Sequence, residues 1–569
     1  MYRFVKILNV SWFRSEEKMK SKVAMVVLIA LLVGASASLF WHFRHEGKFI
    51  LKPVEPTREP EALPEGFLPP KFPWVMRKSN AESDMFYPSF LPRKPEVVFS
   101  IDVSANLGGT LANAMVDGDK IFLADGQGVY ALHRDNGELV WGVEVYSDSL
   151  EGRAISHPQP VTKWRALGLW RFVRACGVGN FLYVATSSNL DLGDAFLLAL
   201  SKENGSVEWM VELESEAGAS SRSSVTSNLV VADGRIYVGS VRDEGYVFCV
   251  GENGALLWRS EVGGIARGLA CGDGILFVTS EPSTRLHALD PKTGETLWIF
   301  EHDAMLSAPS YRDGKVVLAD SQGGLLSFSS EGKLLWRRSL GVGGDVNCDP
   351  YVAVGAQRIY AVRSIGERPL NLFTVDLDGN VGENFTMESD EDGGKPVASR
   401  DVVVLPVRAS EEGKVHLLWR GWAKTGEFSF PNDGWMPVVS AAYGEIYVLA
   451  NPGKLYKLAD IEKPVISSVK AELLEENLVI SVTACDSGSA LYRVLLVYSV
   501  DGSAWSYAEM EVSRRYAVEP VGGYGLEEEV YGARIPLQPD TTLEFYVVAV
   551  DHAGNYEVSG VRAYQVSKG

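Results

Sequence analysis

A short motif that recurs along the chain constrains the fold more than any other feature. Its clearest copy is LHALDPKTGETLW at Leu286–Trp298, in which a glycine precedes a tryptophan by four residues. Each copy reads as two short strands joined by a tight turn, where glycine supplies a positive φ. Five copies keep this spacing, and in two weaker ones, centred on Gly379 and Gly426, phenylalanine replaces tryptophan. The five are Gly137/Trp141, Gly205/Trp209, Gly254/Trp258, Gly294/Trp298 and Gly332/Trp336.

A second strand pattern precedes nearly every copy, as in DGRIYVGSV and YGEIYVLAN. Apolar residues alternate in it with small or polar ones, as in a half-buried antiparallel strand. Four short strands in a period of about 40–50 residues are typical of a β-propeller blade. Eight of these second-strand patterns occur, against seven glycine-centred turns.

The eighth unit ends after its third strand, at Leu455–Leu458, and its fourth strand is found at the other end of the repeat region. EVVFSIDV at Glu96–Val103 aligns with ELVWGVEV at Glu138–Val145. An N-terminal strand that completes the last blade would close the ring and remove its open edges. We therefore predict an all-β chain with an eight-bladed propeller at residues 96–460.

The five repeated tryptophans are predicted to be structural. A ligand would need one large flat side chain and not five at equivalent places, so we expect wedges between neighbouring blades, each with an indole N–H in need of an acceptor. The pattern A-x5-G-x3-W resembles the tryptophan-docking motif of pyrroloquinoline quinone (PQQ)-type repeats. That family includes quinoprotein dehydrogenases and cofactor-free propellers, so the resemblance implies a fold and not an activity. Three copies carry the pattern: Ala131/Gly137/Trp141, Ala199/Gly205/Trp209 and Ala288/Gly294/Trp298.

The resemblance to quinoprotein dehydrogenases implies a vicinal cysteine pair and an acidic and amide cluster for calcium. None of the five cysteines is adjacent to another, and no CxxCH haem motif occurs. We predict no cofactor, with PQQ and Ca²⁺ in the propeller funnel as the alternative. Asp345, Asn347 and Asp349 offer oxygen ligands at alternate positions of an inter-blade loop and are weak candidates for a calcium site. The alternative interpretation is a solvated polar loop without an ion. Asp376–Asn380 superficially resembles a calcium loop but lacks a later bidentate glutamate.

The N-terminal region predicts export. Residues 1–22 are basic, and residues 23–43 contain the 19 uncharged residues Val23–Trp41, with Trp41 and Phe43 near the far interface, which suits one membrane span with a cytoplasmic N-terminus. A cleaved signal peptide ending at Ala35–Ala37 is the alternative. Residues 44–95 hold ten of the 26 prolines and are predicted to be an extended linker that holds the folded body off the membrane.

Residues 461–569 change character, because the repeat motif ends and longer strand patterns follow. TTLEFYVVAVDHAGN at Thr541–Asn555, where a strand ends in D-x-A-G-N, resembles the Ig/fibronectin-III-like modules of prokaryotic surface proteins. We therefore predict a C-terminal Ig-like β-sandwich, which without a disulfide framework must be stabilised by its core.

The net charge of -19 argues against a nucleic-acid binder, which needs a basic face. An insertion at residues 146–171 carries aromatic and arginine side chains that are typical of protein-contact surfaces. Its candidates for a partner surface are Trp164, Arg165, Trp170 and Arg171. We predict a non-enzymatic, membrane-anchored extracytoplasmic scaffold that binds protein or glycan partners at the cell envelope. A quinoprotein-like oxidoreductase is the alternative.

Overall fold

The computed structural model is almost entirely β-structure, with one short 3-10 turn at Glu65–Phe67 among the residues it describes. The described residues are 49–73, 83–103, 114–124, 128–144, 159–160, 171–188, 196–213, 224–225, 227–241, 245–281, 284–340, 351–364, 370–410, 412–432, 436–450, 453–517 and 527–568. Within these ranges no helix has the length and apolar character to cross a membrane. The anchor predicted at residues 23–43 lies outside them.

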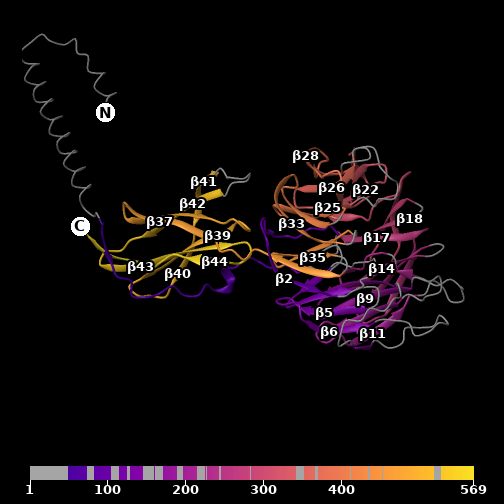
Figure 1. Ribbon diagram of the computed structural model, residues 1–569, viewed down its shortest axis with the longest axis horizontal. Helices are drawn as coiled ribbons and strands as arrows, with labels where there is room; N and C mark the ends of the chain where they lie inside the picture. The colour runs from indigo at the N-terminus through magenta and orange to yellow at the C-terminus, as the bar shows by residue number, and fades with distance from the viewer. Residues whose placement is uncertain are drawn as a thin grey trace, which may run out of the picture.

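Antiparallel sheets of four or five strands follow one another along the chain between Glu96 and Ala459, and Figure 1 shows them gathered in one body. The first three are β3 (Met115–Asp117), β4 (Lys120–Ala124), β5 (Gly128–His133) and β6 (Leu139–Glu144) with β7 (Gln159–Pro160); β8 (Arg171–Val178), β9 (Phe181–Ser188), β10 (Phe196–Ser201) and β11 (Val207–Glu212); and β12 (Ser224–Val225) and β13 (Val230–Ala232) on β14 (Arg235–Val241), with β15 (Tyr246–Gly251) and β16 (Leu256–Glu261). The next two are β17 (Ile265–Gly272), β18 (Ile275–Glu281), β19 (Arg285–Leu289) and β20 (Thr296–Glu301), and then β21 (Ser310–Arg312), β22 (Lys315–Ala319), β23 (Gly324–Ser329) and β24 (Leu334–Ser339).

The remaining sheets of this body complete the series. They are β25 (Tyr351–Val354), β26 (Arg358–Ser364), β27 (Leu370–Asp376) and β28 (Val381–Thr386); β29 (Asp392–Gly393) and β30 (Val397–Ala398) on β31 (Val402–Arg408), with β32 (Glu412–Trp419) and β33 (Ala423–Pro431); and β34 (Val438–Ala442), β35 (Glu445–Ala450) and β36 (Lys454–Ala459), joined by β2 (Glu96–Asp102). The register of β2 on β36 runs from Glu96↔Ala459 to Asp102↔Lys454. The predicted closure by an N-terminal strand is confirmed.

The sheets surround an axis lined by their first strands. Each first strand contacts that of the next sheet, in the order β3, β8, β13, β17, β21, β25, β30 and β34, and β34 contacts β3 again. The middle strands are buried, whereas outer strands such as β16 and β20 alternate between exposed and half-buried residues. The hydrophobic core therefore lies between the sheets, as expected of a propeller.

The residues after β36 form a sandwich of two sheets, which lies beside the propeller in Figure 1. One sheet has the order β37 (Val465–Leu474), β38 (Asn477–Cys485), β42 (Glu527–Pro536) and β41 (Glu511–Ala517). The other contains β40 (Ser506–Glu509), β39 (Leu491–Val500), β43 (Thr541–Asp551) and β45 (Arg562–Lys568), with β44 (Tyr556–Val558) on β43. Apolar side chains of both sheets, such as Ile480 and Phe545, meet in one buried core.

The prediction of an extended linker at residues 44–95 is wrong for the part that the structure describes. Phe49–Val54 forms β1, which pairs with β45 from Phe49↔Lys568 to Val54↔Ala563. Proline is compatible with this ladder because β1 is an edge strand, so that Pro53 needs no second partner. Phe67 then stacks on Tyr507 with ring centroids 4.6 Å apart. The N-terminal segment is therefore part of the sandwich and not a stalk.

A buried carboxylate holds this segment on the sandwich. Glu544 accepts hydrogen bonds from the Thr57 amide at 2.6 Å and hydroxyl at 2.9 Å, and pairs with Arg58 Nε at 2.9 Å. Burial alone would raise the pKa of Glu544, but these donors outweigh it, and the pKa lies below its usual value.

We expect Glu544→Gln to lower the free energy of unfolding by about 1–2 kcal/mol at neutral pH, because charge-assisted hydrogen bonds are lost. The lowered folded-state pKa makes this stabilisation fully present above the unfolded-state pKa of about 4.3, and it is lost as the pH falls through the lower folded-state value. Thermal unfolding of both proteins across this range measures the effect. Glu557→Gln, which breaks an exposed pair with Lys463 at 3.7 Å, is the control and should change little. An equal loss in both variants would contradict the assignment.

Candidate functional site

Each of the five repeated tryptophans lies between its own sheet and the next. The indole N–H groups donate to backbone carbonyls in the turn that joins the third and fourth strands of the following sheet. The bonds are Trp141 to Lys202 at 3.0 Å, Trp209 to Glu252 at 2.7 Å, Trp258 to Pro291 at 3.1 Å, Trp298 to Ser330 at 2.9 Å and Trp336 to Leu377 at 3.1 Å. All five thus have structural partners in the neighbouring sheet.

In five of the seven motifs the glycine packs against the tryptophan of the preceding sheet: Gly205, Gly254, Gly294, Gly332 and Gly379. The turn predicted at Gly426 is wrong, because Gly426 lies inside β33 and has no positive φ. A Cβ atom on Gly294 would lie 2.6 Å from Trp258 Cε3, and the φ of Gly294 is 76°. Where β2 closes the ring, the glycine packs against an aliphatic side chain and not a tryptophan: a Cβ on Gly137 would lie 2.8 Å from Ile101 Cδ1 of β2. Glycine is therefore required both for backbone conformation and for close packing of the indole.

A segment of the N-terminal region, residues 83–93, crosses one end of the propeller axis. Ser83 Oγ donates to Leu269 O on β17 at 2.8 Å, Ser310 Oγ on β21 donates to Ser83 O at 3.0 Å, and the Val354 amide of β25 donates to Asp84 O at 2.7 Å. The segment continues onto the next sheets, where Phe86 bridges in parallel to Ala398 and the Gly444 amide donates to the Tyr87 hydroxyl at 2.7 Å. These contacts lie at or near the ends of the first strands, where each turns into the second. We call residues 83–93 the axial segment.

The axial segment is integral to the propeller core. Met85, Phe86, Tyr87 and Leu91 are all buried within the cluster that includes the last sheets. Asp84 is buried and pairs with Arg312 at 2.7 Å, and the Arg312 guanidinium lies over the Phe86 ring. Burial, the main cause, raises the pKa of the Tyr87 hydroxyl far above its usual value. The segment thus fills this end of the axis with side chains of the chain itself.

Residues 96–250 and 243–418, together more than half of the chain, match a family model described as outer membrane protein assembly factor BamB. The chain belongs to this PQQ-repeat family. No curated protein sequence matches the chain.

Solved structures similar to this BamB-family chain share little sequence with it. BamB from Moraxella catarrhalis is 16% identical with a TM-score of 0.46, over 64% of this chain and 100% of its own. The quinohemoprotein alcohol dehydrogenase from Comamonas testosteroni is 13% identical with a TM-score of 0.49, over 71% of this chain and 83% of its own. At these values the similarity does not bear on function.

The axial segment bears on the quinoprotein alternative at one end of this BamB-family propeller, where first strands turn into second strands; the loops that precede the first strands lie at the other end, where that alternative stays open. A flat quinone at this end of the axis would have to displace Met85 and Phe86, whose exposed fractions are 2% and 4%. The Asp84 carboxylate that lies there already pairs with Arg312. The residues present at this end do not fit PQQ, and no catalytic step is derived through it.

The outer wall of the propeller exposes apolar side chains on consecutive sheets. Leu297 on β20 is 52% exposed, and its neighbour two residues on, Ile299, is 48% exposed. Exposed apolar side chains that recur on the outer strands of successive sheets are a candidate for an interaction site. The residues of this outer wall are Val97 and Val98 on β2, Val207 and Met210 on β11, Leu256 and Leu257 on β16, Leu297 and Ile299 on β20, Leu334 and Leu335 on β24, and Val381 on β28.

The other candidates from the sequence lie largely outside the described residues. Asp345, Asn347 and Asp349 are outside them, as are Trp164, Arg165 and Trp170; Arg171 begins β8, and its side chain is not described. The weak calcium site and the partner surface in the insertion therefore stay predictions.

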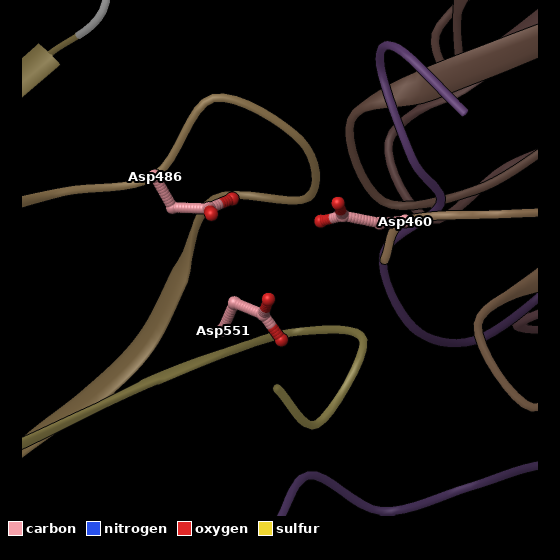
Figure 2. A group of neighbouring side chains, drawn as sticks. All are labelled: Asp460, Asp486 and Asp551. Atoms are coloured by element: carbon pink, nitrogen blue, oxygen red, sulfur yellow. The ribbon is translucent and has the colours of Figure 1, made fainter. Parts of the chain in front are cut away.

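A group that sequence analysis did not identify lies where the propeller meets the sandwich. Asp460, Asp486 and Asp551 bring their carboxylates together from three different loops (Figure 2). Of the three, only Asp551 belongs to a motif recognised in the sequence, the D-x-A-G-N turn, so only Asp551 could have been identified as a candidate. The three positions are far apart in the sequence, so no spacing pattern connects them.

Proposed function

We propose that this BamB-family protein is a non-enzymatic scaffold that binds other envelope proteins through the outer wall of its propeller. The observation that carries the proposal is the row of exposed apolar side chains on consecutive outer strands, which have free backbone edges beside them. An extended segment of a partner can add to such an edge and place its own apolar side chains against the wall. The family description adds the expectation of a role in outer-membrane protein assembly.

We further propose the architecture and placement that this function needs. The closed succession of first strands supports an eight-bladed ring, and the two-sheet core after Ala459 supports an Ig-like module at residues 461–569. A membrane anchor at residues 23–43 would leave only residues 44–48 before β1. In that arrangement the sandwich lies next to the membrane and the propeller beyond it, in the extracytoplasmic space.

The test is site-specific crosslinking in cells of the source organism. We expect a photoreactive side chain at position 297 to give adducts with integral envelope proteins, because Leu297 lies in the middle of the outer wall. Position 474 is the matched control: Leu474 is 54% exposed, against 52% for Leu297, but lies on β37 of the sandwich. Leu297→Asp should remove adducts formed from position 257, the equivalent position on β16 of the preceding sheet, whereas Leu474→Asp should not.

Three outcomes would overturn the proposal. Equal crosslinking from positions 297 and 474 would mean that the wall has no preferred partner, and adducts with glycan alone would mean that the partner class is wrong. Dye-linked oxidation of alcohols or sugars by the purified chain after addition of PQQ and Ca²⁺ would instead favour the quinoprotein alternative.

A further inference from the structure

The carboxylates of Asp460, Asp486 and Asp551 form a cluster between the two bodies of the protein, which we call the junction cluster. One oxygen of each lies within 4.8 Å of the others. Asp460 directly follows β36 of the propeller, Asp486 follows β38, and Asp551 ends β43. Figure 2 shows the three side chains converging from separate loops on one small space.

The cluster is buried and incompletely satisfied. The exposed fractions of Asp460, Asp486 and Asp551 are 5%, 9% and 0%. Asp460 Oδ2 and Asp486 Oδ1 are buried oxygens with no hydrogen-bond partner. Among described side chains, no lysine, arginine or histidine forms an ion pair with any of the three. Buried carboxylates without a counter-charge are strongly unfavourable, so they require either protons or a cation.

A second turn in the same chain shows what is unusual about Asp551. Asp376–Asn380 and Asp551–Asn555 share the sequence D-x-x-G-N. In both turns the backbone amide of the asparagine donates to the aspartate carboxylate at 2.8 Å. The asparagine side chain also donates to that carboxylate, at 2.8 Å in the first turn and 2.9 Å in the second. Asp376 has a lowered pKa, mainly because of these Asn380 hydrogen bonds. The pKa of Asp551 is raised to about 7, first by burial and then by the charges of Asp486 and Asp460. The same turn therefore places its aspartate in a different environment at the junction, where Asp551 is fully buried beside two other carboxylates.

We propose that the junction cluster binds one Ca²⁺ ion, which joins the end of the propeller to two loops of the sandwich. The ligand set consists of carboxylate oxygens, which suit hard cations and not thiolate- or imidazole-seeking metals. Ligand oxygens of Ca²⁺ lie at about 2.3–2.6 Å from the ion, so carboxylate oxygens within 4.8 Å of one another can all reach one ion. Mg²⁺ requires about 2.0–2.1 Å and near-ideal octahedral geometry, which carboxylates from three separate loops match less well.

The surrounding contacts prepare the site for this role. Asp486 Oδ2 accepts from the Gly488 and Ser489 amides at 3.1 and 2.7 Å, which leaves Oδ1 directed to the cluster. Asn555 Nδ2 also donates to Asp460 O at 3.1 Å, across the junction. A Cβ on Gly488 would lie 2.1 Å from Asp460 Oδ1, so the loop packs directly on the carboxylate. Both loops are therefore already held around the proposed ion.

Calcium binding at this site must depend on pH, because the protons and the ion compete for the same oxygens. The other charged groups nearby are Glu462, which adds negative charge, and Arg93 and Arg400, whose charges help to lower the pKa of His552; the Arg93 side chain pairs with Asp401 at 3.0 Å. The pKa of Asp460 is raised to about 6, first by burial and then by Asp486 and Glu462.

The experiment uses the full chain purified in detergent, stripped with EDTA and titrated with CaCl₂ by calorimetry at pH 8 and pH 5. We expect one Ca²⁺ per chain at pH 8, at least tenfold weaker binding at pH 5, and a rise in the unfolding temperature on Ca²⁺ addition that is larger at pH 8. Mg²⁺ should bind at least tenfold more weakly. Absence of Ca²⁺ binding to the wild-type chain would overturn the proposal, and equal Mg²⁺ affinity would overturn the choice of ion.

Substitution of a cluster aspartate should raise the unfolding temperature of the ion-free protein and remove the stabilisation by Ca²⁺. Asp486→Asn should raise the unfolding temperature in EDTA at pH 8, because like charges are removed, and should abolish the increment from Ca²⁺. Asp551→Asn should lose Ca²⁺ binding, whereas Asp376→Asn, in the matched turn, should keep it. Circular dichroism of each variant verifies folding, and Asp460→Asn replaces any variant that fails to fold. Unchanged Ca²⁺ affinity in a folded Asp460, Asp486 or Asp551 variant would overturn the site.

Discussion

Replacement of Tyr87 by alanine is expected to lower the free energy of unfolding of the propeller by about 3–5 kcal/mol. Tyr87 is 1% exposed at the end of the propeller axis, and its hydroxyl is the acceptor for the Gly444 amide. Truncation removes a large buried ring from a place where several sheets meet, and it leaves a buried N–H without a partner. The measurement is urea unfolding followed by tryptophan fluorescence, because the five inter-sheet tryptophans report on the propeller.

Tyr87→Phe is the matched control for this prediction. It keeps the ring and removes only the hydroxyl acceptor, so the expected loss is about 1–3 kcal/mol. The difference between the two variants gives the contribution of the ring. If Tyr87→Ala unfolded at the same urea concentration as the wild type, the axial segment would not be part of the propeller core.

The second large effect is expected at an inter-sheet tryptophan. Trp298→Ala should destabilise the propeller by about 3–5 kcal/mol, because it removes a wedge between two sheets and the donor to Ser330 O. Gly332→Ala should also destabilise, since its Cβ would lie 2.7 Å from Trp298 Cδ2 and its φ is 84°. The same urea experiment measures both variants.

A double-mutant cycle separates the two causes at Gly332. In the Trp298→Ala background the Cβ has space, so Gly332→Ala should cost only the strain of a positive φ, about 1 kcal/mol. Gly274→Ala isolates that strain in the wild type, because Gly274 has a φ of 69° and nothing within 4 Å of a Cβ. Additive effects of Trp298→Ala and Gly332→Ala on the free energy of unfolding would show that the Trp298 ring does not pack directly on Gly332.

The parts of the fold that were predictable from the sequence are those that repeat or that alternate locally. The glycine and tryptophan of each motif lie within one hairpin, so their spacing survives as a pattern, and the alignment of Glu96–Val103 with Glu138–Val145 identified the closing strand for the same reason. The PQQ-repeat family followed from these residues.

The parts that could not be predicted depend on pairings across the whole chain. The prolines around β1 indicated a linker, because sequence alone does not show that Pro53 lies on an edge strand. The apolar residues of the axial segment belong to no repeat or alternating pattern, and they are buried only because strands from several sheets surround them. The junction cluster is hidden for the same reason, since Asp460, Asp486 and Asp551 meet only after both bodies have folded.

The pairing of β1 with β45 has a consequence for the order in which the chain can fold. Thr57 and Glu544, which anchor the same segment, are separated by 487 residues in the sequence. The first described strand to be synthesised, β1, thus pairs with the last, β45. Closing a loop of this length makes the pairing slow. Until then an apolar strand with free edges is exposed, which is a site for aggregation. We therefore expect that Phe49–Val54 must be protected from aggregation until the C-terminal strands have been synthesised, and that the sandwich is the last unit to reach its native state.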